Sequence, residues 1–232
     1  MNPYNNSCLL LFAKSPIKGQ VKTRLAAETG GDFEVELYKC FVEDMISLIE
    51  NIGVRFKLCF YPANMKSTFL EWLGEQHCYI PQTGDNLGER LRNAFDNAFE
   101  EGFSNVVAIG SDSPDLPVHY LIESFEVLAA HDAVIGPAND GGYYLIGFSK
   151  EKFISEVFDN ISWSTDSVFE QTVSILKRHG RKAYLLPLWH DVDTIADLKS
   201  LLLRTRNTAF EKSKTYLYLT AYRSWSKPDV RL

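Results

Sequence analysis

The chain has 232 residues, of which 45% are hydrophobic and 23% charged, and its formal net charge is −6. This length and apolar content predict one large domain with a substantial core, and the acidic balance argues against a broad nucleic-acid surface, which needs a basic face. No apolar run approaches the roughly 18 residues of a membrane helix, and the N-terminal MNPYNNS lacks the regions of a signal peptide. We therefore expect a cytoplasmic protein that has neither a nucleic-acid nor a membrane partner.

Apolar runs typical of strands alternate with helical periodicity along the chain. The runs at 8–12 and 55–61 flank a helical pattern that ends at Ile52, which is the order of a βαβ unit. A second helix follows Asn86, because Asn86 and Glu89 have the spacing of a capping box. Further apolar runs lie at 105–110, 132–136, 143–148 and 182–188, with helices at about 117–130, 165–179 and 195–204. The series predicts a three-layer α/β/α sandwich with a mainly parallel sheet.

Charged residues directly follow four of the predicted strands. In such folds ligands bind outside the carboxyl ends of the strands, and the ends of parallel strands share one edge of the sheet. The four segments are AKSPIKGQVKTRL, GSDSPDLP, GPANDGGYY and WHDVDT. Among the charged residues that they bring to this edge are Lys14, Lys22, Arg24, Asp112, Asp115, Asp140, Asp191 and Asp193.

This combination of charges predicts a site for a metal ion and phosphates. Converging carboxylates repel one another, and Mg²⁺ or Mn²⁺ relieves the repulsion by taking oxygen ligands from them and from substrate phosphates. The cations of the first loop then have nucleotide phosphates as their counterpart, and Gly19 lets the backbone approach closely. Any one of these residues alone is more often a solvated surface charge, so the prediction depends on the convergence of four strand ends.

Five motifs resemble, in the same order, a family of bacterial transferases. They are AKSPIKGQVKTRL, QTGDNLGERL, GSDSPDLP, GPANDGGYYLIG and DVDTIADL, and they span about residues 8–203. The family is that of the radical-SAM/selenodomain-associated transferases, which are GT-A-like members of the nucleotide-diphospho-sugar transferase superfamily. More distantly, the first motif together with DVDT is similar to phospholactate guanylyltransferase, and DVDTIADL to the end of the CMP-sugar synthetase core.

The resemblance implies a GT-A fold and assigns roles to five residues. Asp112 is the implied principal metal ligand and Asp193 the second, while Lys14, Lys22 and Arg24 are the implied contacts to nucleotide phosphates. The chain departs from glycosyltransferases in one respect, because the central motif reads DSPD and contains no D-x-D. A chelate of two aspartates from one turn is therefore not expected.

Other motif residues have a functional and a structural interpretation each. Asp140 precedes Gly141 and Gly142, whose missing side chains would let a ligand meet the backbone, although a tight turn explains the glycines equally well. Arg90 could reach the cleft or pair with a carboxylate. We place Arg90, Gly141 and Gly142 among the candidate nucleotide-binding residues, together with Gln82 of the second motif.

The sequence leaves the roles of Trp163, His190 and Asp115 open. Trp163 could stack on a substrate or pack against its own domain. His190 is the only histidine near these strand ends and could act as a ligand or base, although a lone histidine is usually structural. Asp115 could instead be the acid of a turn that precedes a helix.

Two enzyme mechanisms and one non-catalytic role fit the motifs. In nucleotidyl transfer, a phosphorylated acceptor attacks the α-phosphorus of a nucleoside triphosphate. The metal ion held by Asp112, together with Lys22 and Arg24, would stabilise the charge on the departing pyrophosphate. In glycosyl transfer from a nucleotide sugar, Asp140 could serve as the base for a small acceptor. A nucleotide-binding module is the third candidate. Three cations in one loop suit a triphosphate, so we favour nucleotidyl transfer.

The segment 204–232 lies beyond the resemblance and is basic and aromatic. This composition could indicate nucleic acid, but its aromatic side chains offer more apolar area than a free tail exposes. We therefore expect residues 1–203 to form the transferase domain and residues 204–232 to pack on that domain or on a second subunit of a homo-oligomer. The charged and aromatic residues concerned are Arg204, Arg206, Phe210, Lys212, Lys214, Tyr216, Tyr218, Tyr222, Arg223, Trp225, Lys227 and Arg231.

Overall fold

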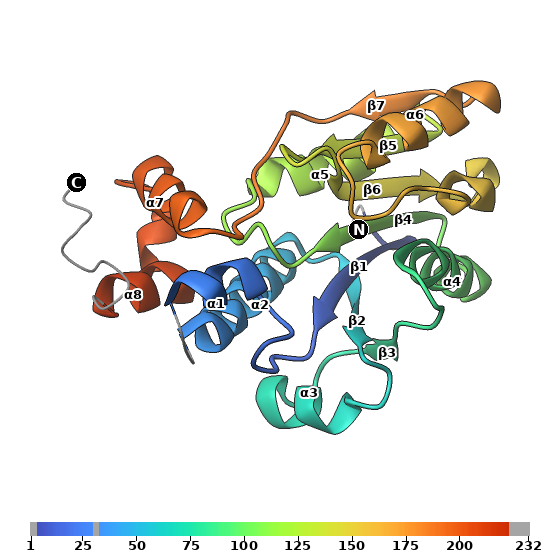
Figure 1. Cartoon of the computed structure of the whole chain (residues 1–232). Coiled ribbons are helices and arrows are strands. Elements are labelled where there is room, and N and C mark those ends of the chain that lie inside the picture. Colours follow the sequence, from blue (N-terminus) through green and yellow to red (C-terminus); the bar gives the residue numbers. More distant parts are fainter. Residues whose placement is uncertain (1–3, 30–32, 223–232) are drawn as a thin grey trace.

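The computed structural model describes residues 4–29 and 33–222 (Figure 1). Its centre is a seven-stranded sheet with the order β3-β2-β1-β4-β6-β5-β7. The strands are β1 (Ser7–Lys14), β2 (Arg55–Tyr61), β3 (Tyr79–Pro81), β4 (Asn105–Gly110), β5 (Ala133–Pro137), β6 (Tyr143–Ser149) and β7 (Ala183–Leu185). Only β6 is antiparallel to its neighbours, and the other strands run in one direction. The predicted, mainly parallel sheet is confirmed.

Helices of the described residues lie between these strands along the chain or follow the last strand. They are α1 (Thr23–Thr29), α2 (Phe33–Ile52), α3 (Lys66–Leu73), α4 (Leu87–Glu100), α5 (Val118–Val127), α6 (Val168–Arg178), α7 (Ile195–Arg204) and α8 (Lys214–Ala221), with 3₁₀ turns η1 (Lys150–Lys152), η2 (Ser155–Phe158) and η3 (Ala209–Lys212). The elements α7, η3 and α8 are those that follow β7. The predicted N-cap is confirmed, because the Asn86 side chain accepts the Glu89 amide at 3.0 Å. None of the described helices combines the length and apolarity needed to cross a membrane.

The sheet divides the core into two layers. On β1, Leu9 and Leu11 point to the layer that contains α2 and α5, while Leu10 points to the layer that contains α4 and α6. This alternation buries both faces of the strand, as its continuous apolar run predicts. Helices therefore cover both faces of the sheet (Figure 1), and the predicted three-layer sandwich is confirmed.

The helices α7 and α8 lie beside α1 and α2 (Figure 1). Asp44 of α2 accepts the backbone amides of Lys214 at 2.9 Å and Thr215 at 2.8 Å, so it caps the first turn of α8. Tyr218 stacks on Phe33 with ring centroids 5.5 Å apart. The described part of the C-terminal segment thus packs on its own chain. The boundary at 203 remains a prediction, and the predicted roles of Arg223, Trp225, Lys227 and Arg231 lie outside the described residues.

Candidate active site

The carboxyl ends of β1, β4, β5 and β7 lie at one edge of the sheet, as their shared direction requires. Several hydrogen bonds join the segments that follow them. The Val192 amide donates to the Asp112 carbonyl at 2.9 Å. The Tyr38 hydroxyl accepts the Lys14 amide at 2.7 Å and shares a 3.0 Å hydrogen bond with Ser111. The loops after β1, β4 and β7 are thereby fixed to one another.

Lys22 lies at the centre of this edge. Its Nζ is 2.5 Å from Asp112 Oδ1 and 3.1 Å from Asp193 Oδ1, and it donates to the Val192 carbonyl at 2.7 Å. The Lys22 side chain is 2% exposed, whereas those of Asp112 and Asp193 are 47% and 41% exposed. A buried ammonium therefore holds together two carboxylates that remain open to solvent.

The backbone of Lys22 is also unusual. Its φ of 47° lies in the left-handed region, which costs a residue with a side chain roughly 1–2 kcal/mol. The Lys22 carbonyl accepts the Ala26 amide at 2.8 Å and so begins α1. Because such strain persists only where the surroundings impose it, the loop is built to direct this side chain inward.

Burial and the charge of Asp112 shift the pKa of Lys22 in opposite directions and that of Asp191 in the same direction. Burial alone would lower the pKa of Lys22, but Asp112 and Asp193 raise it above its ordinary value, so the ammonium stays charged. Burial, with a contribution from Asp112, raises the pKa of Asp191 to about 6. Asp191 Oδ1 accepts a 2.7 Å hydrogen bond from Ser113, so this carboxylate is turned toward the protein.

Asp112 and Asp193 are the residues that fit a divalent metal ion. Both carboxylates reach the same nitrogen atom of Lys22, so both are within reach of one small cation. Among the described residues no group of three or more metal-ligating side chains is present. Mg²⁺ commonly takes only one or two protein carboxylates and completes its shell with water and substrate phosphates. The pair therefore fits Mg²⁺ or Mn²⁺, with the Lys22 ammonium standing at the cation position.

The other cations of the first loop are exposed. Lys14 ends β1, Arg24 lies in the first turn of α1, and both are exposed. Within the described residues, neither the Lys14 ammonium nor the Arg24 guanidinium has an ion pair. Gly19 has a φ of 77°, and no atom lies within 4 Å of where its Cβ would be. The loop combines free positive charge with an open backbone turn.

Gln82 and Arg90 lie on the far side of this loop, at the ends of β1 and β2. The buried Gln82 amide donates to the Cys59 carbonyl at 2.7 Å and to the Ala13 carbonyl at 3.4 Å. Arg90 lies 3.8 Å above the Tyr61 ring and donates from Nε to the Gly84 carbonyl at 3.0 Å. Both side chains therefore order the loop ends, and their contact with a nucleotide remains a prediction.

The turn between β5 and β6 places Asp140 at the same edge. Its Oδ1 accepts the Gly142 amide at 2.9 Å, and the residue is exposed. Gly141 has a φ of 86°, and a Cβ there would lie 2.1 Å from the Asp166 carbonyl oxygen. The glycine thus permits close packing inside the protein. Next to this turn, Asn139 is bonded to His190 Nδ1.

Asp115 is separate from the cluster. Its carboxylate accepts two hydrogen bonds from Arg204, at 2.6 Å from Nε and 2.8 Å from a terminal nitrogen, and its side chain is 4% exposed. This bidentate pair joins the loop after β4 to the end of α7. Asp115 is therefore a structural acid.

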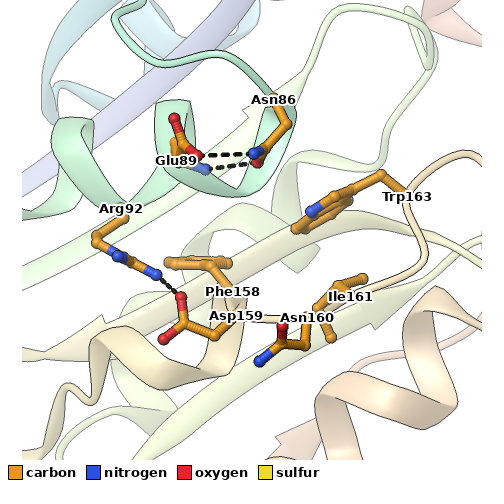
Figure 2. A pocket seen from close by; sticks show the side chains of 8 residues that line it. All are labelled: Asn86, Glu89, Arg92, Phe158, Asp159, Asn160, Ile161 and Trp163. Atoms are coloured by element: carbon orange, nitrogen blue, oxygen red, sulfur yellow. Dashed lines mark hydrogen bonds and ion pairs between the residues drawn. The ribbon is translucent and has the colours of Figure 1, made fainter.

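Trp163 lines a pocket of about 360 Å³ between α4 and the segment after η2 (Figure 2). Arg92 and Asp159 form an ion pair on one side, and Asn86 and Glu89 lie on another. The indole packs close to Gly88, where a Cβ would lie 2.7 Å from Trp163 Nε1. None of the aspartates or cations of the sheet edge lines this pocket.

The sequence did not identify two residues that order this edge of the sheet, Tyr38 and Ser113. Tyr38 falls on the apolar stripe of α2. That pattern predicts a buried ring, but it does not predict what the hydroxyl group contacts. Burial raises its pKa, so the hydroxyl stays protonated as it joins two loops. Ser113, which orients Asp191, lies within a predicted motif, but its partner is 78 residues away.

Comparisons with known proteins extend this description. Residues 45–165 match the family described as "Uncharacterized protein conserved in bacteria (DUF2064)". A crystal structure from Desulfovibrio desulfuricans G20, described as a "putative nucleotide-diphospho-sugar transferase", is 40% identical, with 95% of this chain and 96% of that chain covered and a TM-score of 0.91. A comparison with curated proteins gave no match.

More distant structures share the fold alone. Rv0371c from Mycobacterium tuberculosis H37Rv, in complex with manganese, is 12% identical over 85% of this chain and 98% of that chain, with a TM-score of 0.52. The inositol-1-phosphate CTP transferase from T. maritima is 15% identical over 90% of this chain and 100% of that chain, with a TM-score of 0.51. The chain belongs to the DUF2064 family and has the fold of the nucleotide-diphospho-sugar transferases.

Proposed function

We propose that the protein is a metal-dependent nucleotidyltransferase that moves a nucleoside monophosphate from a nucleoside triphosphate to a small phosphorylated acceptor. One observation carries the proposal. Two half-exposed carboxylates converge on one cation position, beside a loop that exposes Lys14 and Arg24. Such an arrangement neutralises a polyphosphate and a metal ion together.

Six residues of this edge have roles in the proposed reaction. An oxygen of the acceptor phosphate attacks the α-phosphorus, the bond from that phosphorus to the bridging oxygen breaks, and pyrophosphate leaves with the electron pair. Lys14 and Arg24 neutralise the outer phosphates and the departing pyrophosphate. Asp112 and Asp193 would hold a divalent metal ion, which would supply positive charge to the phosphate oxygens. Asp191 and Ser113 position the loop that carries Asp193.

Known structures of this fold support the choice of reaction. One of them is an inositol-1-phosphate CTP transferase, whose acceptor is itself a phosphate ester, and another holds manganese. The resemblance of the first motif to phospholactate guanylyltransferase, and of the last to CMP-sugar synthetases, makes GTP and CTP the first donors to test.

Glycosyl transfer from a nucleotide sugar is the second candidate. It is favoured by the description of the 40% identical structure from Desulfovibrio desulfuricans G20. Asp140 is the residue placed to take a proton from an acceptor, because it is exposed at the same edge and only Oδ1 is engaged in the turn.

The product that leaves the donor separates the two reactions. A thermal-shift screen of nucleoside triphosphates and nucleotide sugars, each with and without Mn²⁺, would first identify the donor, since a specific ligand raises the melting temperature. The donor would then be incubated with candidate phosphorylated acceptors and followed by ³¹P NMR. We expect pyrophosphate. Release of a nucleoside diphosphate would establish glycosyl transfer instead, and no stabilisation by any nucleotide would refute both.

A further inference from the structure

The ammonium of Lys22 stands at the position that the proposed function gives to a metal ion. Its distances of 2.5 and 3.1 Å to Asp112 and Asp193 are hydrogen-bonding contacts between oppositely charged groups. The side chain comes from the loop before α1, far in sequence from both acids. An internal cation therefore already neutralises the carboxylates.

Every donor of this ammonium has a partner. A lysine ammonium has three N–H groups, and Lys22 has three oxygen partners, in Asp112, Asp193 and the carbonyl of Val192. Its Nζ also lies 5.1 Å from the centroid of the Phe41 ring. Lys22 cannot donate to a phosphate in this position unless it leaves one of these oxygens.

The surroundings hold the side chain there. Lys22 is buried and its backbone is left-handed, whereas its partners Asp112 and Asp193 are about half exposed. The cation is thus fixed from the protein side, and the carboxylates are open from the solvent side. A metal ion arriving from solvent meets the same two oxygens that the ammonium uses.

We propose that Lys22 and a divalent cation occupy this position alternately, so that the ammonium acts as a built-in substitute that the metal ion must displace. Two positive charges sharing Asp112 and Asp193 at contact distance would repel each other. Lys22 is then a positioning residue in the metal-free protein, and it becomes available to a phosphate only when the metal ion has taken its place. This inference rests on the proposed function only for the choice of metal ligands.

Mn²⁺ binding in the absence of any nucleotide tests the proposal. Free Mn²⁺ would be measured by electron paramagnetic resonance with the full-length protein and with Lys22→Met, which keeps most of the length of the side chain and removes its charge. We expect Lys22→Met to bind Mn²⁺ at least about tenfold more tightly than the wild type, because the two carboxylates lose their internal cation. Adding Asp112→Asn to Lys22→Met should remove the gain.

The matched control is Lys177→Met, which removes the same charge from an exposed side chain in the last turn of α6, outside the candidate site. Its Mn²⁺ affinity should stay within about twofold of the wild type. Equal affinity in the wild type and Lys22→Met, or no binding by either, would overturn the proposal. Neither result depends on nucleotide transfer, so a failure here is distinct from a failure of the proposed reaction.

Wild-type crystals provide a second measurement should Lys22→Met fail to fold. After soaking in Mn²⁺, the anomalous signal locates the metal ion and the ordinary density locates Lys22. A manganese peak between Asp112 and Asp193 with Lys22 withdrawn supports alternate occupancy, and an intact ammonium bridge without a peak at saturating Mn²⁺ overturns it. A peak beside an ammonium that still contacts both carboxylates overturns it.

Discussion

Two ion pairs formed by the loop after β4 have opposite construction. At Asp112 the cation is buried and the carboxylate is half exposed, whereas three residues later, at Asp115, the carboxylate is buried and only 4% exposed. The first pair keeps an anion available to a ligand. The second uses both carboxylate oxygens inside the protein to fix α7. Both acids lie in one DSPD motif. The candidate site at Asp112 differs from the structural clamp, the Asp115–Arg204 pair, in that the clamp buries the carboxylate and the site buries the cation.

Removing the clamp together with α8 should have the largest effect. Truncation after Leu203 removes Arg204, which leaves the Asp115 carboxylate buried without a partner, and also the buried Leu219. We expect the free energy of unfolding to fall by more than ~3 kcal/mol in urea denaturation. Light scattering would show whether the mass in solution changes. Truncation after Tyr222 is the control that isolates residues 204–222, and equal stability of the two truncated proteins would contradict the packing role.

Arg204→Met tests the clamp alone. Breaking a buried pair by removing one partner typically costs about 3–5 kcal/mol, and because Arg204 is 19% exposed we expect about 3 kcal/mol. Lys39→Met provides the comparison, since the Lys39–Glu36 pair at 2.7 Å is on the surface of α2 and should contribute about 0.5 kcal/mol or less. A loss below 1 kcal/mol for Arg204→Met would mean that Asp115 has no structural role.

Asp112→Asn tests the site and should leave the fold in place. We expect Mn²⁺-dependent donor affinity to fall about 100-fold, or ~2.7 kcal/mol, in isothermal titration, with less than 1 kcal/mol lost in unfolding. Asp115→Asn should show the reverse, a large loss of stability with donor affinity preserved in the folded fraction. Unchanged Mn²⁺-dependent affinity in Asp112→Asn would remove Asp112 from the metal site.

Arg24→Ala should have the smallest effect. Its exposed guanidinium is expected to meet the outer phosphates, so triphosphate affinity should drop about tenfold, ~1.4 kcal/mol, and monophosphate affinity much less. Lys177→Ala in the last turn of α6 is the control for loss of a general surface charge. Equal losses for the two nucleotides would show that Arg24 does not contact the outer phosphates.

The sequence predicted the long elements well and the short ones poorly. The bounds of β2, β4 and α7 agree with the predicted ranges, because a continuous apolar run and a capping box are local signals. The predicted strand 182–188 shortens to 183–185, and α3 and β3 were not predicted because both are too short to show a period.

The convergence of the four strand ends was predictable because it follows from strand direction. The ion pairs and hydrogen bonds within that edge of the sheet could not be predicted. Lys22 was expected to contact phosphates, but its carboxylate and carbonyl partners include residues 170 and 171 positions away, and a loop sequence does not show which way a side chain turns. The exposure that separates Asp112 from Asp115 likewise depends on Arg204, which lay outside the motifs.

The antiparallel direction of β6 has a consequence for the segment that follows it. A strand that starts at the edge with the candidate site ends at the opposite edge, so the chain from η1 to Ser167 must travel back past α4 to reach the first edge again. The position of this segment is fixed by close contacts with two glycines, Gly88 and Gly141. At each of them a hydrogen atom fits and a methyl group does not. The segment from η1 to Ser167 is therefore held in place by close packing at these two glycines. Adding a methyl group at either glycine would shift the segment and leave the sheet unchanged.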